Sequence, residues 1–137
     1  MKTITITRKR KFASCLMPYW IITCMTKDAF KKRFGIDSDV CDIGKDAHPI
    51  NRISGNPYGS PEVLDEIGTR ILNGKTITLE IDDNVRSIFA TTSTGSLSNE
   101  VVIAEIEENE LTITTKGGWK TVSYPYFEKP YPDETYL

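Results

Sequence analysis

The chain has 137 residues, of which 39% are hydrophobic and 26% charged, and these values are typical of one globular domain spanning residues 1–137. Its net charge of −2 excludes a general electrostatic attraction to nucleic acid or to anionic membranes. The three cysteines are an odd number without a CxxC spacing. That pattern argues against a disulfide framework and favours a reducing, cytoplasmic compartment.

The first residues predict a strand followed by a basic segment. Residues 3–7 alternate threonine with isoleucine, so Ile4 and Ile6 are expected to point inward. The run Arg8–Lys11 has two interpretations: a nucleic-acid or nuclear-import patch, or a solvated loop or strand edge. Because the rest of the chain has no basic excess that would extend a patch, we favour the second and expect no nucleic-acid partner.

Residues 12–25 are nearly all apolar and follow a basic segment, an arrangement that resembles a signal peptide. Pro18 and Tyr19 interrupt the run, no small-x-small cleavage motif follows, and its 14 residues fall short of the about 20 that a membrane span needs. We therefore expect a second strand, at 19–25, that is covered on both faces. Tyr19 and Trp20 could stack on a ligand, but packing in the core is the simpler interpretation.

A long connection, residues 26–66, separates the second strand from the third. Thr26 can cap a short helix that ends near Phe34, and Ser60-Pro61 opens another. Between these helices, residues 36–59 are rich in aspartate, glycine, asparagine and proline and contain few periodic apolar residues. Connections of this length are usually functional, so the sequence predicts a partly helical insertion that carries the function.

The stretch 67–81 predicts a β-hairpin that turns at Asn73-Gly74. A two-residue loop would set the isoleucines of the first hairpin strand opposite the polar face of the hairpin strand that follows the turn. A three-residue loop with Gly74 in the left-handed conformation instead sets Ile67 opposite Leu79 and gathers the aliphatic side chains on one face. We therefore predict the three-residue, bulged turn.

Turn residues after the hairpin mark out further short strands. These are expected at 85–94, 98–106, 110–116 and 119–124, with a three-residue loop at 107–109 making a second hairpin. Residues 125–137, with three prolines and four aromatic residues, are expected to be an extended C-terminal tail. The predicted fold class is mainly β: an antiparallel β-sandwich, Ig-like or barrel-like, with about seven strands and an insertion between the second and third.

Several short motifs resemble those of small, uncharacterised bacterial β-sandwich proteins, a family of unknown function. The matching stretches are Ile6 to Phe12, Pro18 to Ile22, Gly68 to Gly74, Leu79 to Ile81 and Ser98 to Glu100. In such proteins the Pro-Tyr-x-Ile motif usually runs directly into a tight Asp-Gly hairpin, whereas this chain has residues 26–66 in that place. The resemblance implies a β-sandwich fold and carries no catalytic residue over to this chain.

The connection also holds the polar cluster most suited to chemistry, which comprises Asp37, Asp39, Cys41, Asp42, Asp46 and His48. A calcium loop requires glycine at its sixth position and glutamate at its twelfth, where this sequence has Asp42 and His48. Zinc requires about four clustered ligands, and only Cys41 and His48 are of its preferred types. A Cys–His nucleophilic pair would need an activated thiolate and a correctly placed base. We predict no metal or cofactor, and the binding candidates are Asp37, Asp39, Cys41, Asp42, His48 and Tyr58.

The function predicted from these features is binding without catalysis. The insertion at 26–66, or an exposed sheet edge, would contact a protein partner, and the edge could also pair with a second copy of the chain. The alternative is a metal-dependent or thiol enzyme centred on the loop from Asp37 to His48. The single histidine of the sequence favours binding over this alternative.

Overall fold

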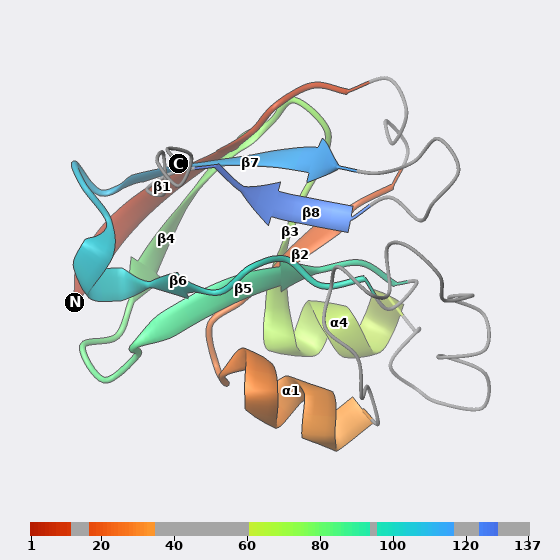
Figure 1. The fold of residues 1–137 in the computed structure, drawn as a ribbon, viewed down its shortest axis with the longest axis horizontal. Coiled ribbons are helices and arrows are strands. Elements are labelled where there is room, and N and C mark those ends of the chain that lie inside the picture. The colour runs from red at the N-terminus through yellow and green to blue at the C-terminus, as the bar shows by residue number, and fades with distance from the viewer. Residues whose placement is uncertain (12–16, 35–60, 94–95, 117–123, 129–137) are drawn as a thin grey trace, which may run out of the picture.

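The computed structural model describes residues 1–11, 17–34, 61–93, 96–116 and 124–128, and it is mainly β (Figure 1). Its elements are β1 (Lys2–Arg8), β2 (Tyr19–Ile22), α1 (Lys27–Phe34), α4 (Pro61–Ile67), β3 (Gly68–Ile71), β4 (Thr76–Ile81), β5 (Ser87–Thr91), β6 (Val101–Val102), a 3-10 helix (Ile103–Glu105), β7 (Glu110–Lys116) and β8 (Tyr124–Phe127). The described strands form two four-stranded sheets rather than a closed barrel. The first sheet has the order β4-β1-β7-β8 and the second the order β3-β2-β5-β6. The Ig-like form of the sandwich stays a prediction.

One pair of strands departs from the antiparallel pattern that the sequence predicts. β1 and β7 run parallel, with Thr5 beside Glu110 and Arg8 beside Ile113. The other described strand pairs are antiparallel. Parallel neighbours need a long crossover connection, and the chain supplies it here by passing through the second sheet between β1 and β7.

The predicted hairpin at 67–81 is wrong, although its turn is correct. Gly74 has a φ of +74°, and the N–H of Lys75 donates to the carbonyl of Leu72 at 3.1 Å. However, β3 pairs with β2 and β4 pairs with β1, so the two strands belong to different sheets. Ile67 ends α4 instead of facing Leu79. The turn is therefore a corner at which the chain crosses from the second sheet to the first.

The second predicted hairpin, around 107–109, is wrong for the same reason. β6 pairs with β5 in the second sheet, whereas β7 lies in the first. Glu108 and Asn109 have φ of 58° and 56°, in a turn closed by the N–H of Glu110 on the carbonyl of Glu107. A further turn, closed by Val85 on Asp82, carries the chain between sheets in the other direction, from β4 to β5.

The beginning of the predicted C-terminal tail is also wrong. Residues Tyr124–Phe127 form β8, which pairs with β7 through Ile113 and Lys116. Proline is tolerated there because β8 is an edge strand. Residues 117–123 and 129–137, which hold most of the predicted strand at 119–124 and the rest of the tail, lie outside the described residues.

β2 divides its side chains between two cores. Tyr19 and Ile21 join a cluster that also contains Ile4 and Ile6 of the first sheet. Trp20 and Ile22 belong to a second cluster with side chains of α1 and α4. All four β2 residues are fully buried, which confirms that this strand is covered on both faces, although it ends at Ile22 rather than residue 25.

α1 and α4 cover the face of the second sheet that is turned away from the first sheet (Figure 1). Thr26 caps α1 as predicted, because its Oγ1 accepts the N–H of Ala29 at 3.1 Å. The Phe30 ring lies 4.7 Å from Phe34 and 5.1 Å from Phe89, measured between ring centroids. These inner faces are therefore part of a core, and the contact role predicted for the insertion stays a prediction because residues 35–60 lie outside the described residues.

A polar contact links α4 to both β2 and β3. Trp20 Nε1 donates to Asp65 Oδ1 at 2.7 Å, and Arg70 Nη2 donates to Asp65 Oδ2 at 2.8 Å. The guanidinium of Arg70 also lies 5.2 Å from the Trp20 ring centroid. The hydrogen bond from Trp20, followed by that from Arg70, stabilises the ionised carboxylate and lowers the pKa of Asp65.

The packing of α1 predicts a large effect of one truncation. Phe30→Ala should lower the free energy of unfolding by about 3–5 kcal/mol, because the ring is fully buried between α1 and β5. Urea unfolding followed by circular dichroism measures this. Lys32→Ala, at an exposed position of the same helix, is the matched control and should change the value by less than about 0.5 kcal/mol. Equal losses in the two variants would contradict the packing of α1 on the sheet.

The lowered pKa of Asp65 predicts a pH dependence of stability. The carboxylate stabilises the fold above its ordinary pKa of 3.8, and this contribution is lost as the pH falls through that value toward the lower folded one. Asp65→Asn keeps an oxygen acceptor for Trp20 but does not titrate. Between about pH 5 and 2.5, the melting temperature of the wild type should fall more than that of the variant. Glu66→Gln on the same helix controls for the loss of one carboxylate, and identical pH profiles of Asp65→Asn and wild type would refute the argument.

Candidate functional site

The binding candidates predicted from the sequence lie outside the part of the chain that the structure describes. They are Asp37, Asp39, Cys41, Asp42, His48 and Tyr58. Among the described residues, no group of three or more histidine, cysteine, aspartate and glutamate side chains is arranged to hold a metal ion. No helix in the same part of the chain is long and apolar enough to cross a membrane. The predicted loop site therefore stays a prediction.

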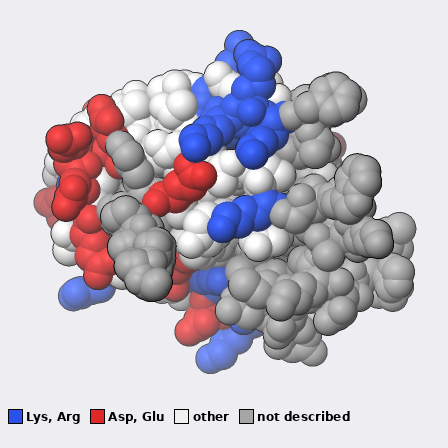
Figure 2. All heavy atoms as spheres, turned by 45° about the horizontal axis from the view of Figure 1, so that its top comes forward, with Lys and Arg blue, Asp and Glu red and all other residues white. Residues whose placement is uncertain are grey.

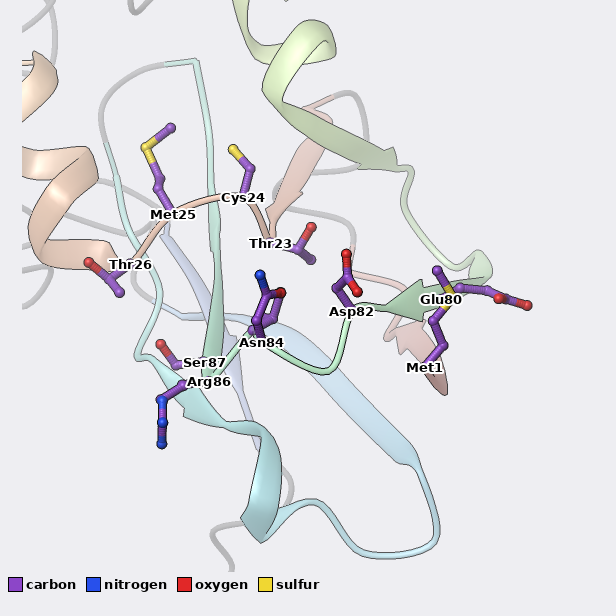
Figure 3. A pocket seen from close by; sticks show the side chains of 11 residues that line it. Met1, Thr23, Cys24, Met25, Thr26, Glu80, Asp82, Asn84, Arg86 and Ser87 are labelled. Atoms are coloured by element: carbon purple, nitrogen blue, oxygen red, sulfur yellow. The ribbon is translucent and has the colours of Figure 1, made fainter.

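An open hollow of about 570 Å³ lies where the ends of β2 and β4 approach the turn before β5 (Figure 3). Its wall includes Thr23, Cys24, Asp82 and Arg86. Cys24 is exposed and carries a free thiol, and its Sγ donates to the carbonyl of Ile67 at 3.5 Å. The hollow mixes apolar and polar side chains near the end of β4, and its lining residues include no histidine.

A different feature, the outer side of β4, presents an ordered row of backbone groups. β4 is an edge strand, and its pairing with β1 sets Ile77 beside Ile6 and Leu79 beside Ile4. The N–H of Arg8 donates to the carbonyl of Lys75, which shows which residues of β4 form hydrogen-bonded pairs with β1. Because backbone groups alternate in direction along an antiparallel strand, every second residue of β4 turns its N–H and C=O away from β1. These residues are Thr76, Thr78 and Glu80, and we call their backbone groups the free edge.

The side chains of β4 place one charged residue, Glu80, on this edge and otherwise lack the features that usually shield an edge strand. Thr76, Thr78 and Glu80 are exposed, and two of them continue a ladder of threonines onto β1, with Thr7 Oγ1 lying 3.1 Å from Thr76 Oγ1. Ile77 and Leu79 face the core but stay half-buried. Proteins usually shield edge strands with proline, lysine or a bulge, and residues 76–81 contain no proline or lysine and keep an unbroken register. Among the described strands, none pairs with the free edge.

Acidic and basic side chains gather at opposite ends of the first sheet (Figure 2). The separation is incomplete, because Lys2 lies beside Ile81 at the acidic end, and Lys9 at the basic end forms an ion pair with Glu128 at 2.8 Å. The acidic end lies where β4 finishes and β7 begins, and the basic end lies where β1 finishes and β4 begins. In Figure 2 the acidic side chains gather on the left and the largest basic group lies at the top. The acidic end comprises Glu80, Asp82, Asp83, Glu107, Glu108 and Glu110, and the basic end comprises Lys9, Arg10, Lys11 and Lys75.

The turn at Gly74 holds the basic end in place. The N–H of Lys11 donates to Asn73 Oδ1 at 2.9 Å. The guanidinium of Arg10 lies beside Gly74, where a Cβ would meet its atoms at 3.0–3.3 Å. These contacts hold the segment after β1 against the turn that precedes β4. The basic side chains are therefore positioned by the end of the first sheet.

Arg8 does not belong to this solvated group, and in this respect the sequence interpretation is wrong. Its side chain is fully buried, donates to the carbonyl of Ile71 at 3.0 Å, and stacks 3.7 Å from the centroid of the Tyr19 ring. Burial lowers the pKa of Arg8, and the Tyr19 hydroxyl is in turn hydrogen-bonded to Thr115. Alternation was the available signal, because Arg8 continues the inward series of Ile4 and Ile6.

The chain matches no protein-family model, no curated protein and no solved structure. The resemblance to small β-sandwich proteins, which was drawn from turn and core motifs, therefore stays a prediction. The free edge of β4 with its charged ends, a feature the sequence reasoning did not locate, is the candidate site that the geometry offers.

The turn that positions the basic end can be tested at Gly74. Gly74→Ala should lower the free energy of unfolding by about 1–2 kcal/mol, because an alanine is strained at a φ of +74°. Gly74→Asn adds the same Cβ beside Arg10 but tolerates the left-handed region better, so it should cost less. Urea unfolding of both variants isolates the backbone strain, and a cost for asparagine as large as for alanine would contradict a left-handed turn at this position.

Proposed function

We propose that the protein is a small β-sandwich domain that works by binding a protein partner rather than by catalysis, and that the partner adds a strand to the free edge of β4. The observation that supports this most directly is the free edge itself, with three outward-facing backbone positions and no proline, lysine or bulge within residues 76–81. In strand addition, main-chain hydrogen bonds supply affinity, and contacts of alternate side chains supply specificity.

The chemistry of the edge defines the segment that fits it. On the core side, the half-buried Ile77 and Leu79 favour apolar side chains at every second position of the incoming strand. On the outer face, the threonines and Glu80 favour β-branched or polar residues between them. The charged ends favour an acidic group near Lys75 and a basic group near Asp82, which would orient the partner.

The insertion at 26–66 is a second contact surface, because long connections on a rigid scaffold commonly carry binding residues. The compartment is cytoplasmic, and the exposed thiol of Cys24 supports this because free exposed thiols persist best in reducing conditions.

The contact strand can be identified with a displayed library of random peptides selected on the wild-type protein. We expect enriched peptides to alternate apolar and polar residues. Their binding to Thr78→Pro should be at least about tenfold weaker, because proline removes the outward N–H and its ring obstructs an incoming strand. Proline is tolerated at an edge position whose N–H faces solvent, so the variant should fold, as checked by circular dichroism.

Thr78→Val is the matched control, because it removes the hydroxyl but keeps the backbone N–H. Fluorescence polarisation with the enriched peptides should give affinities within about threefold of the wild type for this variant. Peptides that bind Thr78→Pro as tightly as the wild type would place binding elsewhere and refute β4 as the contact strand.

A further inference from the structure

We infer that the strand added to β4 is the β4 of a second copy of this chain, paired antiparallel about a two-fold axis through Thr78. This inference rests on the proposed function, because it uses the same free edge. It goes further by fixing the occupant, the register and the residues that meet. The product is one continuous sheet formed from the first sheets of both copies.

The hydrogen-bonding groups select this register. With the axis at Thr78, that residue lies opposite itself, and Thr76 lies opposite Glu80 of the second copy. All three outward-facing residues of each copy then occupy hydrogen-bonded positions of an antiparallel ladder. A shift by two residues in either direction leaves one outward-facing residue of each copy without a strand residue opposite it.

The side chains match in the same register on both faces. On the core side, Ile77 of each copy lies opposite Leu79 of the other, at a non-hydrogen-bonded position where side chains approach most closely. In the single chain both residues are only half-buried, since none of the described strands covers their outer side. On the outer face, Thr78 lies beside Thr78 and Thr76 beside Glu80. The edge is therefore self-complementary in polarity along its whole length.

The charged ends favour the antiparallel arrangement over a parallel one. With the axis at Thr78, Gly74 lies opposite Asp82 of the second copy, and the guanidinium of Arg10 sits beside Gly74. The basic end of each copy therefore faces the acidic end of the other. A parallel pair would instead align acidic with acidic and basic with basic ends. A two-fold interface of this kind is closed, so it yields a dimer rather than a filament.

The register can be tested by placing charges at the axis. Thr78→Lys and Thr78→Glu each set two like charges directly opposite one another in the dimer and should weaken dimerisation at least about fivefold. An equimolar mixture pairs lysine with glutamate and should restore the dimer to within about twofold of the wild type. Sedimentation velocity over a range of concentrations measures the dissociation constants. Raising the salt concentration should weaken the wild-type dimer, because the end charges become screened.

Thr112→Lys is the matched control, because it adds a lysine to the outer face of β7, away from the edge. Its dimerisation should match that of the wild type. Hydrogen exchange provides a second readout. The amides of Thr76, Thr78 and Glu80 should become protected as the protein concentration rises, whereas those of Ile77 and Leu79, which already pair with β1, should not change.

A wild-type protein that stays monomeric at the highest concentration, or a mixture that associates no better than its parent variants, overturns the self-pairing. If selected peptides still lose affinity for Thr78→Pro in that case, the edge binds a different chain and only this inference fails. If they bind Thr78→Pro unchanged, the proposed function fails as well.

Discussion

The structure depends on the requirement that both faces of the second sheet be covered at once. In β2, Tyr19 and Trp20 belong to different cores, and each makes a polar contact on its own side, Tyr19 with Thr115 and Trp20 with Asp65. A shift of β2 by one residue would exchange the two faces and break both contacts. The layer of helices and the first sheet are therefore linked through the register of one four-residue strand.

The free edge follows from the way the chain moves between layers. Strands β3, β4 and β5 are consecutive, yet the turns between them cross from one sheet to the other, so β4 lies beside neither of its sequence neighbours. The same turns supply the charges at the ends of the first sheet. Asp82 and Asp83 lie in the turn after β4, and Lys75 lies in the turn before it. The crossing of these two turns between the sheets thus accounts both for the outward-facing backbone groups of β4 and for the opposite charges at its two ends.

Local features were predictable from the sequence, whereas strand pairing was not. The cap at Thr26, the helix start at Pro61 and the left-handed Gly74 each depend on one or two residues, and the structure has all three. Alternation also predicts the face to which Ile77 and Leu79 point. It does not distinguish a hairpin with β3 from a ladder with β1, because both arrangements bury the same side chains, and edge status depends on the order of the whole sheet.

Arg8 shows a different limit of sequence reasoning. The alternation along β1 indicated that Arg8 points inward. Its place in a run of four basic residues indicated instead that it is exposed to solvent, and arginine is seldom fully buried. The carbonyl of Ile71 and the ring of Tyr19 compensate for the burial, and Ile71 lies 63 residues from Arg8 in the sequence. Such compensation becomes visible only when distant segments are placed together. The predicted binding candidates, from Asp37 to Tyr58, lie outside the described residues and stay predictions.

The position of β1 has a consequence for biosynthesis. β1 occupies the middle of the first sheet, but its neighbours, β4 and β7, begin only at Thr76 and Glu110. During translation Ile4 and Ile6 leave the ribosome well before either neighbour exists, and long-range pairing must overcome loop-closure entropy before it stabilises anything. The nascent chain, with an alternating strand and no partner for it, is thus the form most exposed to misassembly.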